Sequence, residues 1–299
     1  MRLFSIVSLV GSATALGGAL CLAAALNALA QDHPVGPRAP MSRNSELARL
    51  EQRQPALLQS EATVLAPHRK GETDIYAIGM AGWATLDVFA KEVDGGLTAI
   101  GRVLPIKNRV IRLINHPATA VYVPLATLRN FQAAVHDVGK VMDKENDVLV
   151  LFMTSHGDRK GVALQLPNQI VNLTPQDVAA AFKREGIKNR VVIVSACFSG
   201  IFVPPLRNDN TIVLTAADAV HTSFGCAPER DWTYFGDAFF RQALQPGTDF
   251  QSAFQHARIL IQGWELMDRA TPSNPKGFFG PGLVAKLVPF FRSAQAAGQ

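Results

Sequence analysis

Cysteine is scarce in this sequence, with three residues in a chain of 299. Three thiols are too few to build a disulfide-stabilised scaffold. No collagen period, heptad run or solenoid repeat is visible, which excludes fibrous and repeat architectures. Charged residues make up only 18% of the chain and hydrophobic residues 48%, a composition that excludes a mostly disordered protein. The formal net charge is only +5 and the basic residues are scattered, which argues against nucleic-acid binding.

Charge is almost absent from the N-terminal residues. Arg2 is the only charged residue before Asp32, and residues 3–30 are apolar or small and end in an Ala-Leu-Ala triplet. A basic start, an apolar centre and a small-x-small ending are typical of a secretory signal. We therefore expect residues 1–30 to be a signal peptide, and the mature chain to be periplasmic or secreted. The alternative is an inner-membrane anchor through residues 3–30, because this stretch is long enough to span a bilayer.

Composition and periodicity divide the rest of the chain in two. Residues 31–71 are rich in Pro, Arg, Gln and Ser, which indicates a flexible tether or propeptide with at most one helix, around Ser45–Gln59. In residues 72–299, apolar runs typical of buried strands alternate with segments of helical period. The expected strands are Asp74–Met80, Arg109–Ile114, Asp147–Thr154, Arg190–Ala196 and Thr211–Ala216. The expected helices are Thr85–Val93, Leu125–Met142, Thr174–Glu185, Tyr234–Leu244 and Phe250–Met267. This alternation predicts a three-layer α/β fold.

Two of the expected strands run into chemically reactive residues. The third strand continues into His156 and Gly157, and the fourth into Cys197. If the two strands are parallel, His156 and Cys197 emerge at the same edge of the sheet, where α/β proteins place their ligands. A reactive thiol needs a base or an imidazolium nearby, and the backbone N–H groups of Gly157 and Cys197 offer an oxyanion hole. A lone buried cysteine is usually a small hydrophobe, but the pair at two matching strand ends favours chemistry.

The motifs at these strand ends resemble those of the legumain-like cysteine peptidases, peptidase family C13 of the caspase-like clan. The resemblance rests on Thr154-Ser155-His156-Gly157 and on Ser195-Ala196-Cys197-Phe198-Ser199-Gly200, and is closest to bacterial secreted members. Three later segments are also similar to the family, and they are Thr215–Asp218, Thr222–Cys226 and Thr233–Asp237. The resemblance implies a caspase-like fold over residues 72–299, with a mostly parallel central sheet and helices on both faces.

The same resemblance implies a cysteine-type endopeptidase that forms a thioester acyl-enzyme. Cys197 is the implied nucleophile, His156 the acid/base, and Gly157 part of the oxyanion hole. The implied substrate-binding residues are Asp237, Ser223, Thr222 and Ser195. No metal or organic cofactor is implied, and the expected partner is a peptide or protein, with no nucleic acid and no membrane contact beyond the N-terminal segment. The alternatives are a transpeptidase or transamidase on the same site, or a catalytically weak peptide-binding module.

The sequence departs from the family just after the first strand. Family members have an Asn and an Arg-His pair there, whereas this chain has Ala81-Gly82-Trp83-Ala84-Thr85. The departure leaves the residue preference before the cut bond open between Asn and a basic residue, which Asp237 would attract. A second cysteine, Cys226, is expected to be buried and inert, and a disulfide with Cys197 is the alternative.

Overall fold

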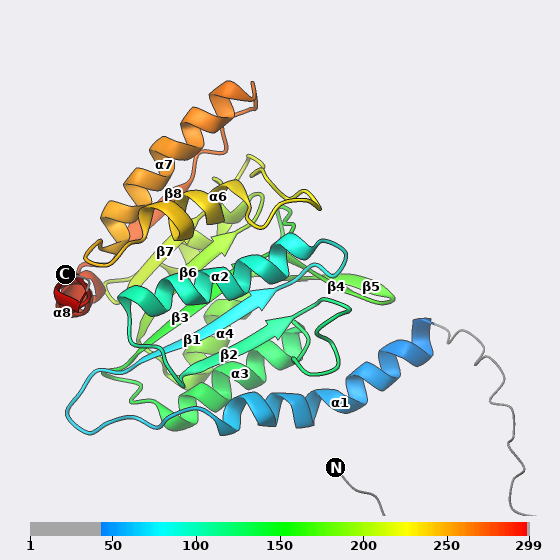
Figure 1. Cartoon of the computed structure of the whole chain (residues 1–299). Coiled ribbons are helices and arrows are strands. Elements are labelled where there is room, and N and C mark those ends of the chain that lie inside the picture. The colour runs from blue at the N-terminus through cyan, green and yellow to red at the C-terminus, as the bar shows by residue number, and fades with distance from the viewer. Residues whose placement is uncertain (1–42, 298–299) are drawn as a thin grey trace, which may run out of the picture. The chain divides into compact units, whose positions relative to one another are not determined.

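The computed structural model describes residues 43–297 of the chain (Figure 1). The predicted signal segment, residues 1–30, lies outside the described residues, and so do residues 31–42 of the expected tether. Among the described helices, none combines the length and the apolar character that crossing a membrane requires.

A six-stranded sheet forms the centre of the structure, in the strand order β2-β1-β3-β6-β7-β8. Its strands are β1 (Ile75–Ala81), β2 (Val110–Ile114), β3 (Val148–Thr154), β6 (Asn189–Ser195), β7 (Thr211–Thr215) and β8 (Lys276–Phe279). The first five strands pair in parallel and β8 pairs antiparallel to β7. A separate antiparallel hairpin consists of β4 (Val162–Leu166) and β5 (Gln169–Leu173). The continuous apolar runs of β1 and β3 are buried at every position, as expected for strands covered on both faces.

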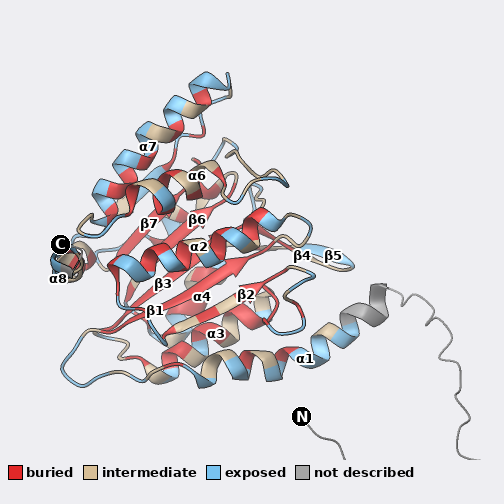
Figure 2. Ribbon diagram, in the orientation of Figure 1, coloured by how far each residue is buried: buried red, intermediate tan, exposed pale blue. Residues whose placement is uncertain are grey.

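Helices cover both faces of this sheet. The helices are α1 (Arg43–Thr63), α2 (Asp87–Val103), α3 (Leu128–Val141), α4 (Pro175–Glu185), α5 (Val203–Leu206), α6 (Tyr234–Gly236), α7 (Phe250–Met267) and α8 (Pro281–Ala297), with a 3-10 turn at Ser199–Phe202 and a π-helix at Asp237–Ala243. One hydrophobic core lies under α2, the π-helix, α7 and α8, and a second lies under α1, α3 and α4. Figure 2 shows the buried sheet between the two helical layers. The fold is therefore the three-layer, mostly parallel α/β arrangement of a caspase-like protein, as predicted.

Local sequence signals explain where several of these elements begin and end. Thr174 caps α4: its side chain accepts the backbone N–H of Asp177, and the Asp177 carboxylate accepts the Thr174 N–H in return. Pro175 occupies the first helical position, where its missing N–H is harmless. The helix stops at Gly186, whose φ of 68° is the left-handed conformation that favours glycine. The predicted boundaries of this helix are therefore confirmed.

Other elements differ from the prediction. The expected helix Thr85–Val93 continues as α2 to Val103, and the expected helix Tyr234–Leu244 is one short turn followed by a π-helix. The hairpin β4–β5, strand β8 and helix α8 were not predicted. The hairpin is only half-buried and β8 has four residues, so neither has the continuous apolar run that marks the central strands.

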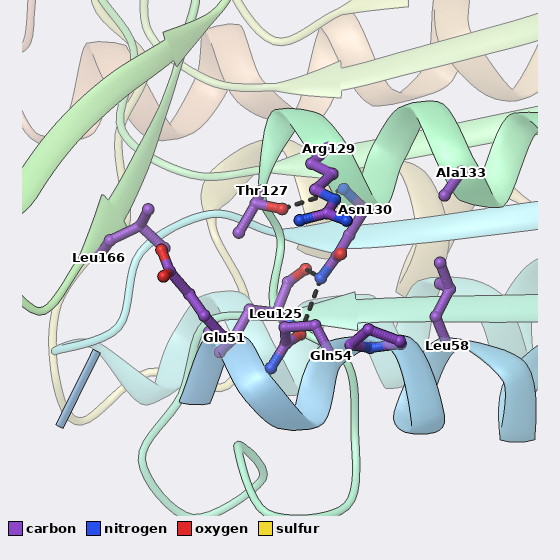
Figure 3. Close-up of a pocket in the computed structure, with 10 residues that line it drawn as sticks. Glu51, Gln54, Leu58, Leu125, Thr127, Arg129, Asn130, Ala133 and Leu166 are labelled. Atoms are coloured by element: carbon purple, nitrogen blue, oxygen red, sulfur yellow. Dashed lines mark hydrogen bonds between the residues drawn. The ribbon is translucent and has the colours of Figure 1, made fainter. Parts of the chain in front are cut away.

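Helix α1 falls in the region expected to be a tether. It packs against α3 and β2, and its buried Gln54 side chain reaches α3 (Figure 3). The Gln54 carbonyl oxygen accepts hydrogen bonds from the Asn130 side chain and from the Leu125 backbone N–H, both at 2.8 Å. A polar group buried in this way is stable only because it is hydrogen-bonded, so the contact fixes the position of α1 on the core.

Candidate active site

The two reactive residues of the sequence lie at matching positions on neighbouring strands. Strands β3 and β6 pair in parallel, and the pairing sets Thr154 opposite Ser195. His156 and Cys197 each follow their strand by the same two residues. The carboxyl ends of parallel strands meet at one edge of a sheet, so an equal offset brings both residues to the same edge. The parallel pairing on which this prediction depended is present.

The Cys197 thiol is held by the loop that follows β7. The backbone N–H of Ser223 donates a hydrogen bond to the Cys197 Sγ atom at 3.3 Å, and the Ser223 hydroxyl lies 3.7 Å from the same sulfur. The thiol in turn lies 3.6 Å from the Ser223 carbonyl oxygen, to which it can donate. Phe198, the residue after Cys197, has a φ of 57°, which is uncommon for a residue other than glycine and marks a strained turn. Its backbone N–H donates to the His221 carbonyl oxygen at 2.9 Å and fixes this turn to the same loop.

Two aromatic rings hold the His156 imidazole. The rings of Trp83 and Phe89 meet it edge-on, with centroid distances of 4.6 and 5.3 Å. Burial in this apolar surrounding lowers the pKa of His156 below its usual 6.5, because the charged form loses hydration. The imidazole is therefore neutral at neutral pH and can accept a proton. Trp83 lies in the segment where the sequence lacks the family's Asn, so an aromatic contact supports the ring there.

The glycine after His156 brings the two strand ends into close contact. A Cβ atom on Gly157 would lie 2.5 Å from the Cys197 carbonyl oxygen, a distance that real side chains do not reach. In the described part of the chain, the N–H groups of Gly157 and Cys197 donate no hydrogen bond. Both amides therefore remain able to bind a negatively charged oxygen.

The expected substrate-binding residues divide between two places. Ser223 contacts the thiol, and the exposed Thr222 lies beside it. Ser195 lies below the site, with its buried hydroxyl bonded to Glu92 and Thr233.

The structure does not bring Asp237 to the thiol. Its carboxylate accepts hydrogen bonds from Arg241 at 2.8 and 2.9 Å and from Gln242 at 2.8 Å. It lines a surface depression with Arg230 and Trp232. Asp237 therefore already has a basic partner, which the sequence did not reveal because Arg241 stands one helical turn further along.

A second acidic residue and a histidine form a pair beside the nucleophile turn. The Asp218 carboxylate lies 2.8 Å from the His221 Nδ1 atom and accepts the backbone N–H groups of Val220 and His221. Although burial opposes it, this set of hydrogen bonds lowers the pKa of Asp218, which favours its ionised form. The pair stabilises the turn of the loop that presents Ser223.

The second thiol of the described chain, Cys226, lies three residues after Ser223. Both Cys197 and Cys226 are free in the structure and half-buried. Burial raises the pKa of the Cys226 thiol, and the charge of the neighbouring Cys197 raises it further. Both effects favour the protonated form of the Cys226 thiol.

Only one group of histidine and acidic side chains in the described residues converges as metal ligands do. It consists of His68, Asp74 and Asp147, at the amino ends of the strands and so at the opposite edge from Cys197. The Asp74 carboxylate is already paired with Arg69 at 2.7 Å and with Arg109 at 3.1 Å. Because two guanidinium groups balance its charge, this cluster has the character of an ion-pair network.

A comparison with protein-family models places these observations in a known class. Residues 118–278 match the model of the Peptidase C13 family. The match covers more than half of the chain and includes both His156 and Cys197, so the chain belongs to the peptidase C13 family. No curated protein matches the sequence. Trp83, which follows β1, and helix α2 with Phe89 and Glu92 precede the matched residues.

Proposed function

We propose that this protein is a cysteine-type endopeptidase, with Cys197 as the nucleophile and His156 as the acid/base. The observation that carries the proposal is the equal two-residue offset of these side chains beyond the paired residues Thr154 and Ser195. Nucleophilic catalysis needs a thiol and a proton-transferring group within reach of one substrate bond, and this arrangement supplies both. Membership of a peptidase family supports the same chemistry.

The proposed reaction has two steps. In the first, the Cys197 sulfur attacks the carbonyl carbon of the substrate peptide bond, and the N–H groups of Gly157 and Cys197 bind the oxygen that becomes negative. His156 takes the proton of the Cys197 thiol and gives it to the departing amine. The C–N bond breaks, and the acyl group stays bound to Cys197 as a thioester. In the second, His156 takes a proton from water, the resulting hydroxide attacks the thioester, and the Cys197 thiol is restored.

The test is the cleavage of a mixed-sequence fluorogenic peptide library under reducing conditions. Wild type is compared with Cys197→Ala and with Cys226→Ala, a matched control that removes the other thiol of the described chain. The proposal predicts cleavage by wild type and by Cys226→Ala, and none by Cys197→Ala. Cleavage that survives in Cys197→Ala would refute it.

The same assay addresses transfer and residue preference. Addition of an amine nucleophile captures the acyl-enzyme if the protein is a transamidase, and the products then carry the amine at the cut carboxyl group. The cleaved library members reveal the residue before the cut bond. Because Arg241 already neutralises Asp237, we expect no strong preference for Lys or Arg from that carboxylate.

We also propose a periplasmic or secreted location, on the basis of the signal-like residues 1–30. Fractionation of cells that express the full chain, followed by sequencing of the mature N-terminus, tests this location. An intact N-terminus in the membrane fraction would instead favour an uncleaved anchor.

A further inference from the structure

A buried carboxylate lies directly below the two reactive residues. Thr154 precedes His156 by two positions and Ser195 precedes Cys197 by two positions, so each hydroxyl lies at the end of the strand that leads into one reactive residue. Both hydroxyls donate to Glu92 of α2: Thr154 at 2.6 Å to one carboxylate oxygen and Ser195 at 3.2 Å to the other. One side chain therefore connects the ends of the two strands.

The same carboxylate also accepts a hydrogen bond from the segment that contacts the Ser223 loop. The Thr233 hydroxyl, at the N-cap of α6, donates to Glu92 at 2.8 Å and accepts the backbone N–H of Gly236 at 3.0 Å. The next residue, Tyr234, donates its backbone N–H to the Phe224 carbonyl oxygen at 3.0 Å. Phe224 follows Ser223 in the chain, and Ser223 contacts the thiol. Glu92 thus contacts both strand ends directly, and it connects to the Ser223 loop through Thr233, Tyr234 and Phe224.

The chain is shaped around this carboxylate. Glu92 has no exposed surface, and a Cβ atom on Gly236 would come within 1.9 Å of its Oε1 atom, so only glycine allows the α6 backbone to lie so close. An isolated carboxylate in an apolar core is costly, and a well-packed apolar residue at such a position is often equally stable. A role other than stability is therefore the better explanation for a glutamate with three hydroxyl donors at this position.

We propose that Glu92 is a positioning residue, whose carboxylate fixes the His156 strand end, the Cys197 strand end and the Ser223 loop relative to one another. The inference rests on the proposed peptidase function. It does not derive from the family match, since Glu92 precedes the matched residues 118–278. Catalysis depends on sub-ångström placement of the reacting groups, so loss of the three hydrogen bonds lowers the rate of the chemical step while substrate binding changes little.

The test replaces Glu92 with Met, which has a similar length and no charge, and with Gln, which keeps one acceptor oxygen. Glu265→Gln is the matched control, because Glu265 is also buried but accepts the backbone N–H of Ser273 and not the hydroxyls that bond to Glu92. All proteins are labelled with a thiol-reactive peptidyl ketone, which reports its binding and its reaction with Cys197 separately, and kcat and KM are measured on a cleaved peptide.

We expect the labelling rate and kcat of Glu92→Met to fall by about tenfold to a hundredfold, with probe affinity and KM within about threefold of wild type. Glu92→Gln should lie between Met and wild type, and Glu265→Gln should match wild type. A folded Glu92→Met protein with the labelling rate and kcat of wild type would overturn the proposal, and so would an equal loss in Glu265→Gln.

Two further measurements keep the test decisive. If Glu92→Met does not fold, Thr154→Val and Ser195→Ala each remove one donor and should lower kcat in the same way. A wild-type kcat in both variants overturns the proposal.

If wild type is not labelled at all, the proposed function fails, and the positioning role is then tested by the ring resonances of His156 in an NMR spectrum. They should shift in Glu92→Gln and not in Glu265→Gln, and identical spectra for all three proteins overturn the proposal.

Discussion

Replacement of Glu92 by Gln is expected to change how the stability of the protein depends on pH. Complete burial raises the pKa of Glu92 from its usual 4.5 to about 7, against the opposing effect of three hydroxyl donors. Between these two pKa values the folded protein holds a proton that the unfolded chain has lost, so stability falls as pH rises through this window. The difference between the two pKa values corresponds to about 3 kcal/mol of unfolding free energy, and the protein loses most of this stability between about pH 5 and about pH 8.

The assay is urea unfolding of wild type and Glu92→Gln at several values between about pH 5 and about pH 8. Other groups that titrate in this window, including His156, are present in both proteins, so their contributions cancel in the difference. The unfolding free energy of Glu92→Gln relative to that of wild type should increase by about 2–3 kcal/mol as pH rises through this range. Parallel stability curves for the two proteins would refute the reasoning.

A second variant tests the cause of the shift. The Thr233 hydroxyl lowers the pKa of Glu92 by donating to its ionised form. Thr233→Val removes this donor, so the loss of stability should occur at higher pH than in wild type. A shift toward lower pH would contradict the assignment of the hydrogen bond.

Three further predictions concern the site and its support. Burial lowers the pKa of His156 below 6.5, so the imidazole takes up a proton only below that pH. In the Glu92→Gln protein, kcat/KM should therefore fall only below pH 6.5. A fall that begins above pH 6.5 would contradict this prediction. Gly157→Ala places a methyl group 2.5 Å from the Cys197 carbonyl oxygen and should lower kcat by at least about tenfold, while the Cys197 thiol still reacts with iodoacetamide; unchanged kcat would exclude the close contact. Gln54→Ala leaves two buried N–H groups without an acceptor and should cost about 1–3 kcal/mol in urea unfolding, with kcat unchanged; an unchanged unfolding free energy would show that the contact is not needed.

The central strands and the reactive pair could be predicted because their signals are local. The run Val148–Met153 is apolar at every position, as expected for a strand covered on both faces. The motif that follows each strand then lies at the edge where the strands end. Two short segments of sequence were enough to predict the site, because residues that follow two paired parallel strands by the same number of positions lie near one another.

The missing parts of the site depend on contacts between distant segments. Glu92 is 62 residues from Thr154 and 141 from Thr233 in the sequence, and no local pattern joins them. One signal was available, since Phe89, Glu92 and Val93 share the buried face of α2, where a glutamate is unusual.

The pairing of Thr154 with Ser195 also limits how the length of this chain can vary. An insertion or deletion of one residue within β3 or β6 would turn one reactive side chain to the opposite face of the sheet and separate the pair. The hairpin β4–β5 and helix α4 lie between these two strands in the sequence and do not set the offset. Engineered insertions should therefore be tolerated at the exposed turn between Leu166 and Gln169 and should be destructive within either strand.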